Sequence, residues 1–426
     1  MNFTQCNLGG GVRLHLCETD KFKSVVCKIF IQQDLDPKYA AATALIPLLL
    51  RRGSQRFPTT QQIARELEYL YAAKFGSDVL KIGERQVLEF YFEMVDPALL
   101  PNGVQNIERG LRTFWDIASN PAGSEDAFLE KYFVQEKRNL EQEVASLLND
   151  KRAYALARSL AIMCADEPFG IYKYGDLASI RELRNEEVHA HYRRLWRHYP
   201  LDIFLVGANL DVLANLCSQF ARERQELKKL KPPQTRKVKE HRLAEEKLDL
   251  QQTVLILGYR TGCTYLDPDY YALLVGNGIL GCFPHSKLFM NVRERASLAY
   301  YVNSNLEGTK GILTISAGID GSKRQETRKI IEKQLHDLQA GQISEEELEQ
   351  TKRGLISGIA ALNDNPASLI NRNLIGIVNG ELRTVDQVIR AIQAVGAQDA
   401  AEAMNKVVLD TIYILSPEGG DSGGPN

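Results

Sequence analysis

The chain has 426 residues, of which 44% are apolar and 25% are charged, and its formal net charge is −2. This length suggests two or more domains, and the composition is ordinary for a globular protein. The near-neutral charge gives no reason to expect nucleic acid or an anionic membrane surface as a partner. The N-terminus lacks a basic segment followed by an apolar one, and the most apolar run is too short to span a bilayer. We therefore expect no signal peptide, no membrane contact and a cytoplasmic location.

The first half alternates strand-like and helix-like runs. Strands are predicted over residues 12–16 and 24–32, and an apolar helix over 37–52. Thr59 and Gln62 form a predicted capping box for a helix that ends near residue 71. The remaining predicted elements are strands over 77–82 and 86–94, helices over 106–117 and 124–148, a strand over 202–206 and a helix over 211–224.

The second half repeats a similar order of signals after a polar linker over 226–247. Strands are predicted over 253–259, 299–305, 311–317 and 411–415, and helices over 268–275 and 325–338. Ser344 and Glu347 form a second predicted capping box, for a helix that runs towards residue 361. The sequence thus predicts an N-terminal domain over 1–225, a C-terminal domain over 248–415 and a disordered Gly- and Pro-rich tail over 416–426. The matching order of signals favours a duplicated α+β unit.

The seven cysteines are scattered and never form a Cys-x-x-Cys pair. Their odd number argues against a disulfide framework, and their spacing argues against a thiolate zinc site. We expect neutral, mostly buried thiols. The seven positions are Cys6, Cys17, Cys27, Cys164, Cys217, Cys263 and Cys282.

Three stretches resemble the insulinase-like (pitrilysin-like) zinc metallopeptidases and the mitochondrial processing peptidases. Residues 52–68 are similar to the segment that follows the family's zinc motif, and residues 169–175 to the loop before the strand that closes the first half. Residues 285–300 are similar to the signature of the family's second half and are the most specific match. The resemblance implies an α+β fold in which two homologous sheet-plus-helices halves form a clam-like shell around a polar chamber.

The family's chemistry needs a His-x-x-Glu-His motif on the first helix of the fold. The two histidines lie on one helical face and bind zinc, and the glutamate takes a proton from the zinc-bound water. Counted back from Gly53, these positions fall on Ala44, Pro47 and Leu48, and no histidine occurs between His15 and His189. We therefore expect no zinc in this chain and no peptidase activity of the chain alone. Pro47 should also kink the helix.

Two further pairs keep the family's spacing. Glu136 and Glu143 match a Glu-x6-Glu pair whose second member is the family's third zinc ligand, although glutamates on a solvated face explain them better here. Arg293 and Tyr300 match an Arg and a Tyr that hydrogen-bond the substrate backbone near the scissile bond in the family. A guanidinium and a phenol can both donate to a carbonyl oxygen as charge develops on it. The alternative is a surface arginine and a half-buried strand tyrosine.

Three other patterns are weaker. The glycines at 276, 278 and 281 match a dinucleotide fingerprint, but they follow a helix-like run without a βαβ unit, which favours a Gly-rich turn. His189 and His191 are two residues apart, a spacing that splays side chains on a helix and argues against a metal site in this segment, which also contains His198. His285 has no visible metal or base partner in the sequence.

The resemblance implies a division of labour found in some relatives. This chain would be the non-catalytic subunit of a heterodimer, in which a zinc-bearing paralogue supplies metal and base and this chain supplies Arg293 and Tyr300. An extended peptide substrate would add to a sheet edge. The alternatives are a structural or assembly subunit and a peptide-binding homodimer without proteolytic role. Residues 287–301 also resemble a Gram-positive bacterial branch whose members are labelled as associated with modification of elongation factor P.

Overall fold

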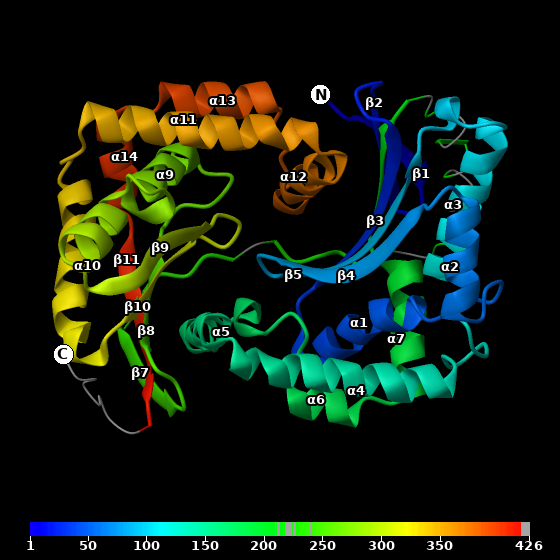
Figure 1. Cartoon of the computed structure of the whole chain (residues 1–426), viewed down its shortest axis with the longest axis horizontal. Helices are drawn as coiled ribbons and strands as arrows, with labels where there is room; N and C mark the ends of the chain where they lie inside the picture. The colour runs from blue at the N-terminus through cyan, green and yellow to red at the C-terminus, as the bar shows by residue number, and fades with distance from the viewer. Residues whose placement is uncertain are drawn as a thin grey trace. The chain divides into compact units, whose positions relative to one another are not determined.

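The computed structural model describes residues 1–208, 210, 214, 215, 217, 224, 227–232, 234–238 and 240–418, without the side chain of Val104 (Figure 1). The chain forms two compact units. Unit 1 comprises Met1–Ser146, Ile171–Pro232 and Asn365–Leu374, and unit 2 comprises Leu147–Gly170, Pro233–Asp364 and Ile375–Asn426. Each unit contains one β-sheet with helices, which confirms the predicted α+β class. Among the described helices, none has the length and apolarity that crossing a bilayer requires.

The unit 1 sheet has six strands in the order β1-β2-β6-β3-β5-β4. Its long central strands are rich in Val, Ile and Phe, which suit a pleated surface covered by helices. All neighbours are antiparallel except β2 and β6, which run parallel. Each strand that the sequence predicts in the first half is present, and β1 is an addition. The strands are β1 (Thr4–Gly9), β2 (Val12–Glu18), β3 (Ser24–Asp34), β4 (Lys74–Ile82), β5 (Arg85–Val95) and β6 (Leu201–Gly207).

Helices α1 and α2 of unit 1 begin at side-chain caps. The Asp36 carboxylate accepts from Lys38 N at the start of α1, and Thr59 and Gln62 form the predicted capping box of α2. The helix predicted from residue 124 begins only at Glu130, because residues 123–128 form a turn closed by an isolated bridge. The helices are α1 (Pro37–Leu50), α2 (Thr60–Tyr69), α3 (Gly103–Ser119), α4 (Glu130–Ser146), α6 (Leu177–Glu182) and α7 (Asn185–His198), of which α6 and α7 were not predicted. The predicted helix over 211–224 falls largely outside the described residues.

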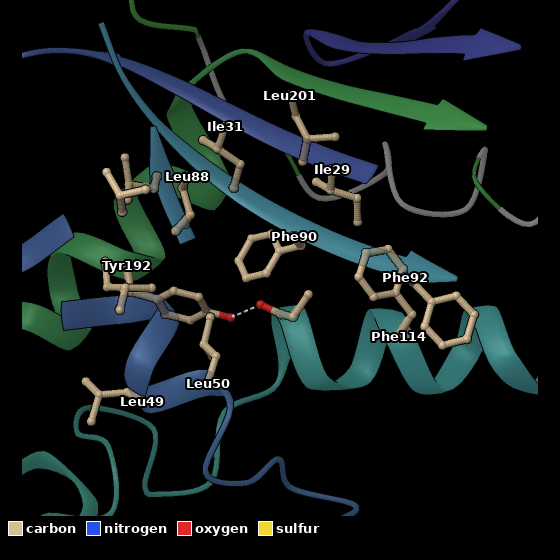
Figure 2. Packing of buried hydrophobic residues seen from close by; sticks show 14 of the residues in the cluster. Ile29, Ile31, Leu49, Leu50, Leu88, Phe90, Phe92, Phe114, Tyr192 and Leu201 are labelled. Atoms are coloured by element: carbon tan, nitrogen blue, oxygen red, sulfur yellow. Dashed lines mark hydrogen bonds between the residues drawn. The ribbon is translucent and has the colours of Figure 1, made fainter. Parts of the chain in front are cut away.

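The core of unit 1 lies between its sheet and its helices (Figure 2). The rings of Phe92 and Phe114 stack with centroids 5.3 Å apart, which joins β5 to α3. Leu49 and Leu50 enter the same core from α1, and the Tyr192 hydroxyl donates to the carbonyl of Ala118 at 3.2 Å. The last turn of α1 is therefore part of the hydrophobic core.

The unit 2 sheet has five strands in the order β7-β11-β8-β10-β9, with β7 and β11 parallel and the other neighbours antiparallel. Ser344 and Glu347 form the predicted capping box of α11. The strands are β7 (Arg242–Leu248), β8 (Thr253–Arg260), β9 (Ala299–Glu307), β10 (Ile312–Ile319) and β11 (Val408–Pro417). The helices are α5 (Lys151–Met163), α9 (Tyr270–Asn277), α10 (Arg324–Gln339), α11 (Glu345–Ala361), α13 (Val385–Ala394) and α14 (Ala397–Met404), and the sequence predicted α9, α10 and α11. Helix α12 (Pro366–Asn379) is divided between the two units.

The two units do not follow the linear domain boundaries that the sequence suggested. Helix α5 comes from the first half of the chain, yet Ala155 packs in a buried cluster with residues of β8 and β11 in unit 2. Conversely, the start of α12 groups with unit 1, where Asn371 accepts from Lys28 Nζ at 2.8 Å. The predicted linker also contains most of β7, and the first two residues of the predicted tail belong to β11, whereas residues 419–426 lie outside the described part. Composition cannot reveal such pairings between segments that are distant in sequence.

Four charged side chains are buried together in unit 2 and tie the segment after α5 to the sheet. The Arg260 guanidinium contacts Glu167 at 2.5 Å and Asp410 at 3.1 Å. Lys310 Nζ lies 2.7 Å from the second oxygen of Glu167. Burial alone would raise the pKa of Glu167, but the hydrogen bonds from Arg260 and Lys310 outweigh it and hold that pKa below its ordinary value. Two cations and two anions thus balance one another inside the unit.

Candidate functional site

Helix α1 carries the three positions at which the resemblance places the zinc motif. Ala44 is 2% exposed, Pro47 is buried and Leu48 is half-buried. None of these side chains has a nitrogen, oxygen or sulfur atom that could bind a metal. Across the described part of the chain, no three His, Cys, Asp or Glu side chains are grouped so that they could hold a metal ion. The side chains at these positions therefore cannot bind the zinc ion of the peptidases that this sequence resembles.

Pro47 is accommodated inside α1 rather than at its end. The helix continues to Leu50 although proline removes the N–H that would bond to the carbonyl of Thr43. The carbonyl of Pro47 accepts from the hydroxyl of Ser77 on β4 at 2.9 Å. The helix is thus not interrupted at Pro47, and its last turn is tied to the neighbouring strand.

A buried polar network lies beside the zinc positions. Arg194 donates to His191 Nδ1 at 2.9 Å, so the proton of the neutral ring is on Nε2, which lies 2.8 Å from Thr43 Oγ1. Thr43 Oγ1 donates to the carbonyl of Tyr39 and accepts from Gln33. Burial, together with Arg194, lowers the pKa of His191 to about 3. His191 is therefore a neutral core residue whose two ring nitrogens both hydrogen-bond to other side chains.

This network predicts a specific acid sensitivity of unit 1. The folded state keeps His191 neutral down to about pH 3, whereas the unfolded chain takes up a proton near the ordinary pKa of 6.5. The stabilisation is complete above the unfolded pKa and is lost as pH falls. Between about pH 7 and pH 5 we expect the free energy of unfolding to drop by about 2 kcal/mol from this group. Urea unfolding followed by tryptophan fluorescence measures it, because Trp115 and Trp196 are the two tryptophans and both lie in unit 1.

The control is His191→Gln, whose amide can replace the Nε2 donor but does not titrate. The variant should be less stable at neutral pH, and its stability should depend less on pH over the same window. An unchanged pH dependence in this variant would assign the acid sensitivity to other groups.

The retained acidic pair on α4 splits into one buried and one exposed residue. Glu136 is 6% exposed, lies 3.2 Å from Arg52 Nε and accepts from Asn139. Glu143 is exposed, as expected for a residue on a solvated face. The solvated-face prediction is therefore wrong for Glu136, because Arg52 at the end of the zinc-motif segment folds back onto it. The charge that faces Glu136 is a guanidinium.

Arg293 and Tyr300 both lie on irregular backbone in unit 2. Arg293 is in the π-helical segment η6 (Phe289–Arg295), a conformation that is rare and often found at functional sites. Tyr300 is the extra residue of a β-bulge, since Ala299 pairs with Ile319 and Tyr301 with Gly318. Bulges re-aim a side chain at sheet edges and near active sites. Two departures from regular structure thus present the predicted pair.

Both side chains are available to a ligand. Tyr300 is 62% exposed, and Arg293 has a side chain that is 44% exposed. The Arg293 guanidinium lies 4.8 Å from the ring centre of Phe289 and 3.8 Å from the Glu294 carboxylate. These contacts orient the arginine but do not bury it. The alternative of a half-buried strand tyrosine is wrong for Tyr300.

The sequence reading missed an arginine that lies beside the same strand. Arg152 at the start of α5 lies 4.4 Å from the ring centre of Tyr301, and its Nη2 donates to Asn303 Oδ1 at 2.7 Å. Nothing in the sequence could pair it with a strand about 150 positions away, because α5 itself was not predicted. Its position follows only from the packing of α5 on the unit 2 sheet.

The weaker sequence patterns have structural explanations. Added Cβ atoms at Gly276, Gly278 and Gly281 would lie 2.6, 2.5 and 2.7 Å from neighbouring atoms, so these glycines permit close packing. They lie in α9 and the π-helical segment η5 (Gly278–Cys282), not after a strand.

His189 packs edge-on against the ring of Phe128. His285 bonds to Thr351 and stacks on Phe283. All seven cysteines are free thiols, and all but Cys6 and Cys282 are buried.

Comparison with known proteins places the chain in a family. Residues 182–355 match the model described as the peptidase M16 inactive domain. The "Probable inactive metalloprotease YmfF" of Bacillus subtilis is 31% identical over 417 residues, 97% of each chain. The crystal structure of a conserved protein from Enterococcus faecalis V583 superposes with a TM-score of 0.92 at 29% identity, covering 98% of this chain and 99% of that one. The chain therefore belongs to the M16 metallopeptidase family, and lacking a zinc motif it is a non-catalytic member.

A second Bacillus subtilis relative is named as a zinc protease. The "Uncharacterized zinc protease YmxG" is 28% identical over 179 residues, which is 41% of this chain and 43% of that protein. The label concerning elongation factor P is not tested by these comparisons and stays a prediction.

Proposed function

We propose that this chain is the non-catalytic subunit of a two-subunit zinc peptidase. A zinc-bearing paralogue would supply the metal and the general base, and this chain would supply Arg293 and Tyr300. The observation that carries the proposal is that the zinc-motif positions have lost their ligands while the Arg/Tyr pair is present. Ala44 and Pro47 are packed into the core, whereas Arg293 and Tyr300 stay exposed on irregular backbone.

The two side chains suit the recognition of a peptide backbone. A guanidinium and a phenol are both donors, and donors aimed at a carbonyl oxygen stabilise the negative charge that develops there. Tyr300 lies on β9, the last strand of the unit 2 sheet. An extended peptide that adds to this edge would pass close to the tyrosine and would bind through main-chain hydrogen bonds.

A zinc-bearing paralogue in the same cell is a reasonable partner. Bacillus subtilis has a relative named as inactive and another named as a zinc protease, so one organism can carry both kinds of chain. In this proposal, zinc is held by the partner and not by this chain.

Co-expression of this chain with a zinc-bearing paralogue from the same genome tests the proposal. We expect the chains to co-purify, the pair to cleave unstructured peptides, and each chain alone to be far less active. Metal analysis should find zinc in the pair and none in stoichiometric amount in this chain. If the paralogue alone is as active as the mixture, the proposed composite site does not exist. A complex that forms without any gain in turnover would instead indicate an assembly subunit.

A further inference from the structure

The outer edge of β9 has no paired strand among the described strands, and at Ser304 its carbonyl accepts from Cys282 Sγ at 3.6 Å. The sheet ends at β9, and no described strand pairs along its far side. An edge strand leaves every second N–H and C=O pointing outward, and these groups can bind a further extended chain. Tyr300 and Asn305 are exposed along this strand.

One face of this strand carries a three-layer stack. The Tyr301 ring covers Gly318 on β10, where an added Cβ would lie 2.3 Å from the ring. Arg152 covers the ring with its guanidinium carbon 4.4 Å from the ring centre. Asn303, two residues along the strand and hence on the same face, accepts from Arg152 Nη2 at 2.7 Å. The stack and the hydrogen bond hold the guanidinium at one place beside the edge strand.

Arg152 retains donors for a ligand. A guanidinium has five N–H donors, of which the contact with Asn303 uses one, and Arg152 is exposed. The nearest acidic residue along α5 is Asp150, whose carboxylate accepts from Ala153 N as the helix cap. A pre-ordered arginine loses little conformational freedom when it binds. These properties favour a carboxylate as its ligand.

We propose that Arg152 is a specificity-determining residue that selects peptides with Asp or Glu beside Tyr301 and Asn303. This inference rests on the proposed addition of the substrate peptide to β9. Side chains that lie directly opposite on neighbouring strands are about 4.5–5.5 Å apart, so a peptide residue opposite Tyr301 or Asn303 meets Arg152 on their common face. A carboxylate there accepts from the free guanidinium donors.

Fluorescence anisotropy with the full-length chain tests the proposal. The probes are fluorescein-labelled unstructured peptides in which one Glu moves along an otherwise neutral sequence, each with a Gln and a Lys counterpart. At one position the Glu peptide should bind about fivefold tighter than its Gln counterpart at low salt. Arg152→Gln should abolish this difference, and Arg152→Glu should reverse the preference towards the Lys peptide.

Arg158→Gln is the matched control, because Arg158 lies on the same helix but pairs with Glu246 on β7, at the opposite end of the sheet. It should keep the preference for Glu. The proposal is overturned if Arg152→Gln retains the preference, or if wild-type protein binds Glu and Gln peptides equally while Tyr300→Ala weakens both. If no peptide binds, or if Tyr300→Ala changes nothing, docking at β9 itself is overturned. Urea unfolding of each variant shows whether it folds.

Discussion

Replacing Arg293 with alanine or Tyr300 with phenylalanine should lower kcat of the assembled peptidase by about 100-fold, with a much smaller change in KM. The loss of one preorganised donor to a developing oxyanion costs about 3 kcal/mol of transition-state stabilisation. Both side chains are exposed, so their removal should leave the free energy of unfolding nearly unchanged. Steady-state kinetics with an unstructured peptide, on the co-purified pair, measures the effect.

Two matched variants control for exposure and residue type. Arg295→Ala removes an exposed arginine of the same π-helical segment, whose Nη1 donates to Asn291 at 2.9 Å. Tyr69→Phe removes the hydroxyl of a tyrosine that is 66% exposed in unit 1. Neither should change kcat. Arg293 and Tyr300 are not part of the reaction if kcat falls equally in the control variants. The same conclusion follows if their substitution weakens the complex but leaves its turnover number unchanged.

Glu167→Gln should lower the free energy of unfolding of unit 2 by about 3–5 kcal/mol. The substitution leaves Arg260 and Lys310 buried with only the Asp410 carboxylate to balance them. Tryptophan fluorescence reports on unit 1 alone, whereas far-UV circular dichroism reports on both units. We therefore expect an early transition in the circular dichroism curve that the fluorescence curve does not follow.

The control is Glu245→Gln, which breaks an exposed ion pair with Arg324 at 3.5 Å and should cost less than about 1 kcal/mol. A second variant separates charge from shape. Adding Lys310→Met to Glu167→Gln removes the excess buried cation and should recover part of the lost stability. If the double variant is less stable than the single one, unbalanced charge is not the cause.

The sequence predicted the strands of the two sheets better than several of the helices. Strands β3 and β5 are long apolar runs whose pattern needs no tertiary information, and the capping boxes at Thr59 and Ser344 are local. Helix α7 was not predicted because charged residues and histidines make up most of its sequence and leave a narrow apolar face. Helix α5 was not predicted although most of its residues are apolar. The absence of zinc ligands at Ala44 followed from counting residues alone.

The environment of the candidate residues could not be predicted. Exposure of Tyr300 depends on a bulge that one strand forms against its neighbour. The burial of Glu136 depends on Arg52, which lies 84 positions earlier in the sequence. Both are properties of pairs of segments, and a single sequence without its relatives contains no signal for such pairs.

Helix α5 and the beginning of α12 each belong to the unit that the other half of the sequence mainly builds. The chain therefore passes between the units several times, and the passage within the predicted linker, between residues 232 and 233, is only one of these. A protease that cut this linker would not produce two complete modules, because each fragment would keep a segment that the other needs. The two fragments would have to associate to restore both units. Loss of either half in evolution would also remove a segment that packs on the sheet of the other half.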